Sequence, residues 1–149
     1  MDICIREIRE DDRKIYLKLA NDFYNSSACL HPIEIKKLEN SFDYILKSKV
    51  YADLYMLEVN NRIIGYCMVS KTYSQEAGSM VLWAEELYII EEYRSKGIAT
   101  KVFNYLFEKY KDYSRIRLEV TKENEGAMKL YKRLGFDVFE YVQMIVERP

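Results

Sequence analysis

Apolar positions in the first third of the chain repeat first with a strand period and then with a helical one. Residues 3–8 alternate between apolar and polar and predict a strand. One helical face follows, at spacings of three and four, and consists of Tyr16, Leu19, Ala20, Phe23 and Tyr24. Asn25-Ser26-Ser27 ends this helix. Pro32 opens a second helix, with the apolar face Ile35, Leu38, Phe42 and Leu46.

The middle of the chain is predicted to form strands. Residues 54–59 and 62–70 are two strand segments joined by Asn60-Asn61, which predicts a tight hairpin. A polar loop is expected over residues 72–79. The next strand covers residues 80–90 and is interrupted by Glu85-Glu86.

The last third begins with the clearest helical pattern of the chain. Its apolar face consists of Ala99, Val102, Phe103, Leu106, Phe107 and Tyr110. Residues 115–120 alternate as a strand, and a short helix then ends at Gly135. Residues 136–146 are predicted to be a final strand. The order β-α-α-β-β-β-α-β-α-β predicts an α/β (α+β) fold, a mixed sheet flanked by helices, in one domain over residues 1–149.

Composition narrows the class of protein. The chain has 149 residues, 49% of them hydrophobic, and a net charge of −1, so a nucleic acid is not expected as a partner. We expect no membrane segment and no secretory leader. Cys4, Cys29 and Cys67 are widely spaced and read as reduced thiols of a cytoplasmic protein, with no metal site.

The turn at residues 94–100 is a candidate pyrophosphate site. Free N–H groups at a helix start, beside Arg94 and Lys96, suit an anion, and Gly97 allows a close backbone approach. The segment lacks the glycines of a dinucleotide fingerprint and the Gly-Lys-Ser/Thr of a Walker A loop. Taken alone, such a turn favours the alternative of an ordinary solvated turn.

Two motifs decide between these alternatives. Arg94-x-x-Gly97-x-Ala99 resembles the Q/R-x-x-G-x-G/A signature of the GNAT superfamily of acetyl-CoA-dependent N-acetyltransferases. Farther along, the segment Asn124–Phe136 is similar to the N-x-x-A-x-x-L/F-Y-x-x-x-G-F motif of the same superfamily. The close resemblance covers residues 80–146, and the amino-terminal half matches in element order only.

The resemblance implies an acyl-CoA N-acyltransferase fold, with a mostly antiparallel mixed sheet of about six strands flanked by four helices. Two central strands would splay apart and hold acetyl-CoA between them. The residues implied to contact acetyl-CoA are Leu87, Tyr88, Ile89, Arg94, Ser95, Lys96, Gly97, Ile98, Ala99, Thr100, Asn124, Ala127 and Tyr131.

Two adjacent acids are the candidates for binding and deprotonating an amine. Burial of Glu85 and Glu86 in an apolar strand is costly unless they are paired or face a cleft. Strand alternation points them to opposite faces unless a bulge redirects both. The alternative is a surface salt bridge for each. They resemble the paired acids of spermidine/spermine N-acetyltransferases, which favours Glu86 first and Glu85 second as catalytic residues.

The remaining catalytic groups follow from the reaction. The Leu87 N–H is the expected oxyanion donor. Tyr131 is the candidate general acid, because a phenol pKa of about 10 exceeds the thiol pKa of about 8.5; its alternative role is core packing. Four residues are weaker candidates for the acceptor pocket, with core packing or helix capping as the alternative for each: Phe23, Tyr24, His31 and Trp83.

These observations predict an N-acetyltransferase that transfers acetyl from acetyl-CoA to a primary amine of a small molecule, such as a polyamine, an amino acid or an amino sugar. Attack would be direct, in a ternary complex, without a metal. A homodimer is left open. The alternatives are acetylation of a protein amino terminus or lysine, and a non-catalytic acyl-CoA-binding module.

Overall fold

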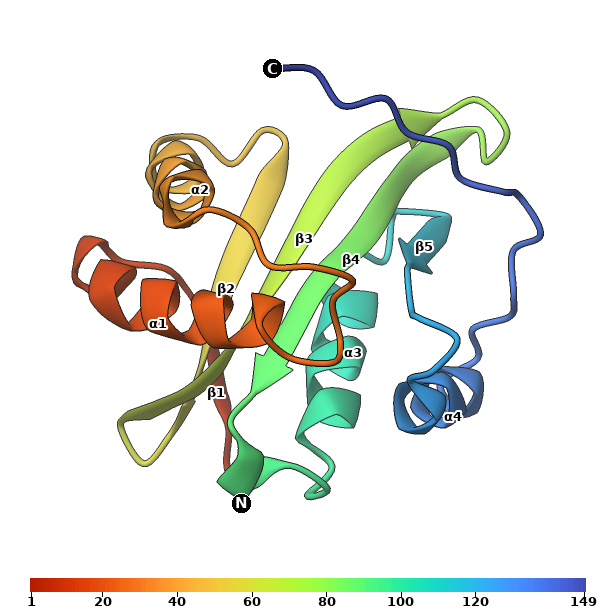
Figure 1. Cartoon of the computed structure of the whole chain (residues 1–149). Coiled ribbons are helices and arrows are strands. Elements are labelled where there is room, and N and C mark those ends of the chain that lie inside the picture. Colours follow the sequence, from red (N-terminus) through yellow and green to blue (C-terminus); the bar gives the residue numbers. More distant parts are fainter.

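The computed structural model describes residues 1–149 and is built on one five-stranded sheet (Figure 1). The strands lie in the order β1-β2-β3-β4-β5. Their bounds are β1 Cys4–Glu7, β2 Ala52–Val59, β3 Arg62–Ser74, β4 Ser79–Ile89 and β5 Arg115–Leu118. Neighbouring strands are antiparallel except β4 and β5, which are parallel. The predicted mixed, mostly antiparallel sheet is confirmed.

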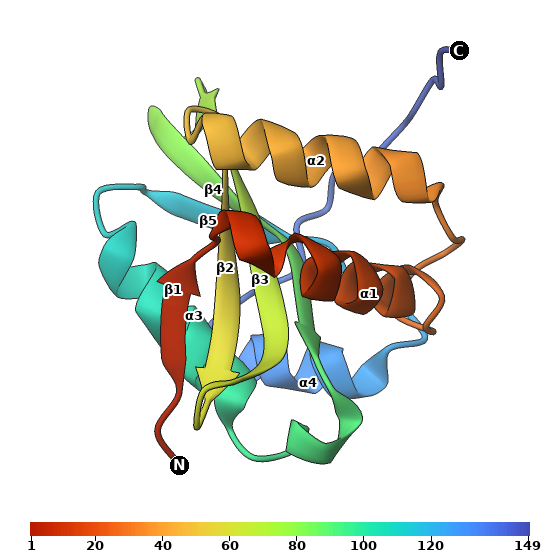
Figure 2. The ribbon, with the colours of Figure 1, turned by 90° about the vertical axis from the view of Figure 1, so that its left-hand side faces the viewer.

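Four α-helices cover the two faces of this sheet: α1 Arg13–Tyr24, α2 Ile35–Lys47, α3 Ile98–Lys109 and α4 Glu125–Arg133. Figure 2 shows α1 and α2 together on one side and α3 on the other. Each side has its own buried cluster, one packed around Phe42 and Tyr66 and the other around Val102 and Phe103. Short 3-10 helices, η1 Glu10–Asp12 and η2 Glu91–Tyr93, precede α1 and α3.

The predicted hairpin between β2 and β3 is confirmed, with a backbone reason. Asn60 and Asn61 have φ of 50° and 62°, the left-handed conformation that both central residues of a type I′ turn require. The second hairpin is tighter than expected, because β3 continues through Ser74 and β4 starts at Ser79. The loop predicted over residues 72–79 is therefore too long.

The prediction of a final strand over residues 136–146 is wrong, and the five strands of the sheet stay close to the predicted number of about six. No residue after Leu118 lies in a strand. Phe136 packs against Phe103 and Phe107, and the chain beyond it runs past β5, where Phe139 lies against Arg115 and Arg117. Only the end of the tail stands away from the body of the molecule (Figures 1 and 2). Alternation alone does not make a strand, which also requires main-chain pairing. Residues 137–149 form no backbone hydrogen bond, although the outer edge of β5 is free.

One irregularity of the sheet creates the functional cleft. β4 pairs with β5 only from Val81 to Ala84, where Leu118 is the last partner. β4 itself runs on to Ile89, still paired with β3. The edge of β4 beyond Ala84 is thus left open between the two layers of helices.

Candidate active site

A cavity of about 230 Å³ lies at the point where β4 and β5 separate. Because the sheet is open there, residues from both faces line it, including Phe23 from α1 and Phe103 from α3. The same cavity brings together about half of the predicted site residues: Glu85, Glu86, Leu87, Ile89, Arg94, Ala99, Asn124, Ala127 and Tyr131, beside Phe23. The two motifs, some thirty residues apart in the sequence, therefore meet in one cleft.

Main-chain groups of β4 form one wall of this cleft. The Ile90 N–H donates to the Ile64 carbonyl at 2.9 Å, so this residue faces β3. Main-chain groups of successive residues point to opposite edges of a strand, and those of Leu87 and Ile89 therefore face the open edge. The Ile89 carbonyl accepts the Arg94 Nε at 2.7 Å. The Leu87 N–H and C=O have no strand partner on this side and are free for a ligand.

The turn before α3 presents a row of free N–H groups. Ser95 and Gly97 have φ of 58° and 77°, and α3 begins directly after Gly97. The backbone N–H groups of residues 95–100 donate to no acceptor in the protein. A Cβ built on Gly97 would meet nothing within 4 Å, so the space beside this turn is open. This geometry is suited to an anion at the positive end of a helix.

The start of α4 forms the opposite wall. The Asn124 Oδ1 caps the helix by accepting the Ala127 N–H at 3.2 Å, which leaves the amide NH₂ group available. Thr121 lies in the same wall, and its buried Oγ1 has no hydrogen-bond partner. A buried hydroxyl without a partner costs folding free energy, so Thr121 adds a second polar group that a ligand would satisfy.

Glu86 is held by two tyrosines from different elements. The Tyr24 hydroxyl of α1 donates to its Oε2 at 2.6 Å, and the Tyr66 hydroxyl of β3 donates to its Oε1 at 2.6 Å. Burial raises the pKa of Glu86 above its ordinary value, although the two hydroxyls act in the opposite direction. A carboxylate with a raised pKa is a better proton acceptor than a solvated one.

A β-bulge explains why both acids lie on one face of the sheet. Met68 pairs with Glu86 and Val69 with Ala84, so Glu85 is an extra residue in β4. Glu85 accepts the Ser70 hydroxyl at 2.6 Å, on the face that also carries Tyr66. Strict alternation is therefore wrong here, and the bulge redirects both carboxylates to the face that α1 and α2 cover.

Tyr131 lies on the other side of the cleft, on α4. Its ring packs edge-on against Phe103 and Phe136, at 5.7 and 6.0 Å between ring centroids. Burial raises the pKa of its hydroxyl further above the ordinary tyrosine value. The ring thus packs in the core and the residue also lines the cleft. The role of Tyr131 as general acid stays a prediction.

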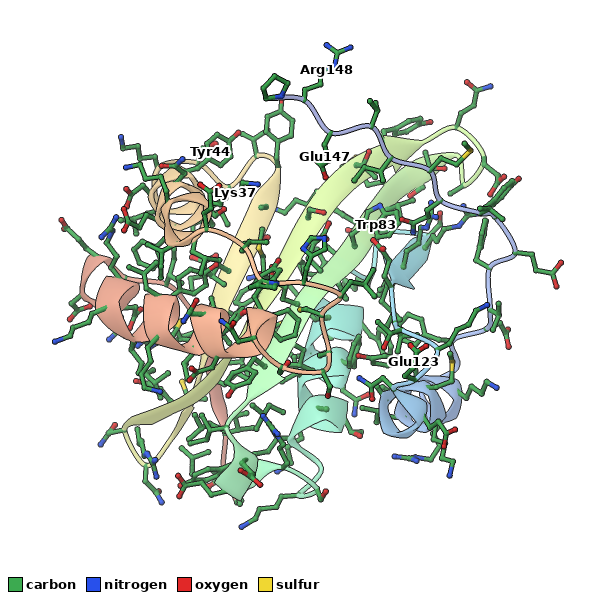
Figure 3. The ribbon with its side chains drawn as sticks, viewed as in Figure 1. Lys37, Tyr44, Trp83, Glu123, Glu147 and Arg148 are labelled. Carbon is green, nitrogen blue, oxygen red and sulfur yellow. The ribbon has the colours of Figure 1, made fainter.

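The four weaker candidates for the acceptor pocket lie in different places. Phe23 lines the cleft and contacts the Tyr24 and Tyr66 rings, and Tyr24 bonds to Glu86. Trp83 lies in a neighbouring groove beside β5, where the Arg117 guanidinium is 4.2 Å from its ring centroid (Figure 3). His31 is exposed, and its one polar contact is with the Pro32 carbonyl at 3.4 Å. The structure does not bring His31 into the cleft.

Tyr88 differs from the other residues of β4 that were expected to contact CoA. Its main chain faces β3, and its ring lies on the α1 side, against Phe23 and beneath the Arg94 guanidinium. Tyr88 thus buttresses the turn at Arg94 from the far face of the sheet.

Sequence reasoning missed Tyr66, Ser70 and Thr121. Tyr66 and Ser70 reach the acids only because the bulge sets the register between β3 and β4. The one available signal is the pair Glu85-Glu86 itself, since two adjacent acids in an apolar strand require polar partners on the neighbouring strand. No pattern in the sequence marks Thr121.

Comparison with known proteins agrees with this geometry. The model of the acetyltransferase (GNAT) family matches residues 11–136. The chain belongs to this family. Among relatives, it is 28% identical over 141 residues to the thialysine N-epsilon-acetyltransferase of Mus musculus, covering 88% of this chain and 82% of that one. It is 27% identical to an uncharacterized N-acetyltransferase of Methanocaldococcus jannaschii, and spans 62% of that longer protein.

Solved structures share the GNAT fold of this chain. One is "a possible acetyltransferase from Clostridium difficile 630", with a TM-score of 0.83, 24% identity and coverage of 99% and 98% of the two chains. Another is an aminoglycoside N-acetyltransferase in complex with CoA, with a TM-score of 0.79, 16% identity and coverage of 99% and 96%. In addition, no helix of this GNAT protein is both long and apolar enough to cross a membrane.

Proposed function

We propose that this GNAT protein transfers the acetyl group of acetyl-CoA to a primary amine of a small, positively charged molecule. The observation that carries the proposal is the composition of the cleft. One cavity holds free main-chain donors for the cosubstrate, a partly buried carboxylate for the amine and a tyrosine for the leaving group.

The residues present fit acetyl-CoA. The free N–H groups of residues 95–100 suit the pyrophosphate, and the Leu87 main chain, the Asn124 amide and the unpartnered Thr121 hydroxyl suit the polar pantetheine arm. Acetyl-CoA supplies the activated acyl group. Side chains and main-chain groups of this chain remove the proton from the amine, stabilise the oxyanion and protonate the leaving thiolate.

Glu86 takes the proton of the attacking amine. An amine attacks only in its neutral form, so an ammonium substrate must first lose a proton. Each Glu86 oxygen accepts one tyrosine hydroxyl and keeps a further lone pair, to which the amine donates directly or through one water. Tyr24 and Tyr66 position the carboxylate. Glu85 adds a second negative charge that attracts the cation.

Leu87 and Tyr131 complete the transfer. The Leu87 N–H faces the open edge of β4 and donates to the carbonyl oxygen as negative charge develops there. Tyr131 gives its phenolic proton to the departing sulfur. Burial raises the Tyr131 pKa, so the hydroxyl stays protonated until the thiolate forms.

The charge of the acceptor side favours a cationic substrate. Two carboxylates and several aromatic rings face it, and these groups attract and stack against an ammonium group. The relative from Mus musculus is a thialysine N-epsilon-acetyltransferase, so lysine-like side-chain amines belong first in the panel. Polyamines and amino sugars follow.

A thiol-release assay with acetyl-CoA and this panel tests the proposal, run beside calorimetry of acetyl-CoA binding. Release with one class of amine would establish the enzyme and name its substrate class. Binding without release from any amine would contradict the proposal and favour a protein acceptor or a non-catalytic module. Absence of binding would show that the interpretation of residues 94–100 is wrong.

A further inference from the structure

Gly65 of β3 lies at a point where a side chain would collide with the neighbouring strand. A Cβ built on it would lie 2.1 Å from the Tyr88 carbonyl oxygen, and real Cβ atoms essentially never come within 3.0 Å of another atom. A Cβ on any of the other glycines of the chain would meet nothing within 4 Å. Gly65 belongs to a paired strand and not to a turn, so the absence of a side chain serves a close approach of two main chains.

This close approach lies in the part of β4 that has separated from β5. Gly65 pairs with Ile89, whereas β4 pairs with β5 only as far as Ala84. The next residue, Ile90, donates its N–H to the Ile64 carbonyl at 2.9 Å. In Figure 1 the end of β4 accordingly lies beside β3 and apart from β5. The last residues of β4 are therefore held from the β3 side alone.

The end of β4 is connected to both main-chain parts of the cleft. The Ile89 carbonyl accepts the Arg94 Nε at 2.7 Å, and the Arg94 guanidinium lies 5.5 Å from the centroid of the Tyr88 ring. The turn over residues 95–100 follows directly. A movement of the peptide between Tyr88 and Ile89 would displace the wall formed by β4 together with this turn. Gly65 itself does not line the cavity, so it acts on a ligand only through these groups.

We propose that Gly65 is a positioning residue for acetyl-CoA. Because Gly65 has no side chain, β4 lies close against β3, and the cleft along the opposite edge of β4 stays wide enough for the pantetheine arm. This inference rests on the proposed function, since it concerns the cosubstrate side of the same cleft.

A side chain at this position would displace β4 rather than β3. β3 is a central strand, and Gly65 also pairs with Leu57 of β2 on its other side. β4 has no neighbouring strand beyond Ala84 and is free to move toward its open edge. The Tyr88 carbonyl would have to move by about 1 Å to relieve the collision, and a misplacement of this size in a site can cost about 100-fold.

Gly65→Ala tests the proposal by calorimetry of acetyl-CoA binding, well below the Tm of wild type and variant. Binding should weaken by about 100-fold. The KM for acetyl-CoA should rise with it, while the KM for the amine changes little, because Glu86 pairs with Met68 farther along β3. Val69→Ala is the matched control. Val69 is buried on β3 and does not line the cavity, so this variant should lose thermal stability and keep the Kd for acetyl-CoA.

Ile90→Pro tests the same contact without adding a side chain to β3. Ile90 has φ of −61° and ψ of 148°, which proline adopts without strain, so the substitution removes the N–H that ties β4 to Ile64. The end of β4 should then move away from β3 and into the cleft, and acetyl-CoA should bind more weakly. Ile90→Ala loses the side chain but keeps the N–H, and should bind acetyl-CoA more tightly than Ile90→Pro.

The outcomes separate this inference from the proposed function. Binding by wild type, with an unchanged Kd in folded Gly65→Ala, would overturn the inference and leave the proposed function standing. If Gly65→Ala does not fold, equal binding by Ile90→Pro and Ile90→Ala would overturn it instead. Absence of acetyl-CoA binding by wild type would overturn both.

Discussion

The two sides of the cleft differ in the groups that they present, which are main-chain groups on one side and side chains on the other. On the α3 side the cleft presents main-chain groups: the Leu87 N–H and the row of N–H groups at residues 95–100. On the α1 side it presents side chains, above all Glu86 between Tyr24 and Tyr66. The α3 side needs a backbone conformation, whereas the α1 side needs particular functional groups in a particular register.

This difference explains why one side of the cleft could be predicted from the sequence and the other could not. A backbone conformation leaves a short local signature, because a left-handed residue at the start of a helix calls for glycine, here Gly97. Side chains brought together from α1, β3 and β4 leave no local signature. The cosubstrate is consequently readable from the sequence, and the acceptor is not. The following substitutions separate the two sides, from the largest expected effect to the smallest.

Glu86→Gln should lower kcat/KM for the amine by about 10²–10⁴-fold, the usual contribution of a general base. Binding of acetyl-CoA, measured by calorimetry, should stay unchanged, because Glu86 belongs to the acceptor side. Glu85→Gln is the matched control and should act mainly on KM. Equal activity of wild type and Glu86→Gln would remove Glu86 from the mechanism.

Gly97→Trp should do the reverse and weaken acetyl-CoA binding by about 100-fold, the equivalent of two lost charge-assisted hydrogen bonds. The indole would occupy the open space beside the turn, and any side chain at φ +77° is strained. Gly97→Ala separates the two causes, since it carries the strain with little of the bulk. Tight binding by Gly97→Trp would place the pyrophosphate elsewhere.

Tyr131→Phe should lower kcat by about 10-fold, less than Glu86→Gln, because a thiolate leaves readily even without a proton donor. The ring contacts with Phe103 and Phe136 are kept, so thermal stability should change little. Phe103→Leu is the packing control. A large loss of stability in Tyr131→Phe, with kcat intact, would assign the residue to the core alone.

Tyr66→Phe removes one hydroxyl that donates to Glu86, which further raises the Glu86 pKa. Glu86 must be ionised to accept a proton, so the acidic limb of the kcat/KM profile should move to higher pH. A hydrogen bond to a charged group predicts a displacement of about one pH unit. Tyr55→Phe, a buried hydroxyl outside the cleft, should leave the limb in place. An unmoved limb in Tyr66→Phe would show that this tyrosine does not act through Glu86.

Much of the fold was predictable from the sequence, and the errors share one cause. Helix faces such as Val102, Phe103 and Leu106 follow from local spacing, and the Asn60-Asn61 turn follows from backbone preference. The expected strand over residues 136–146 is wrong, and at Glu85-Glu86 the bulge, the alternative to strict alternation, is what the structure has. In each case the outcome depends on main-chain pairing between strands: residues 136–146 do not pair with β5, and a bulge shifts the pairing of β3 with β4.

The candidate site also contains residues of two kinds: some lie in local motifs, and others are brought into place by strand pairing. Arg94, Gly97, Asn124 and Tyr131 lie in short motifs with fixed spacing, and all of them reach or border one cleft. Tyr66 belongs to no motif, since its role comes from pairing with a strand that is twenty residues away. A single sequence carries no record of such a register.

The smallest expected effect is that of Glu86→Gln on stability. The substitution should raise the stability of the fold at alkaline pH, although it lowers the activity. Because the folded pKa of Glu86 is raised, the fold favours its protonated form. The stability linked to this proton is fully present below the unfolded pKa of about 4.3 and is lost as the pH rises through the folded pKa. Glu86→Gln is neutral at every pH and escapes this loss.

The difference in Tm between Glu86→Gln and wild type, measured by thermal melts, should therefore increase with pH. The variant should gain a few degrees in Tm relative to wild type between pH 4 and alkaline pH. A site that costs stability and supplies activity is typical of catalytic groups. If the difference in Tm stays constant with pH, Glu86 is not destabilised by ionisation in the fold. The acceptor side would then lack the poised base that sets it apart from the main-chain side.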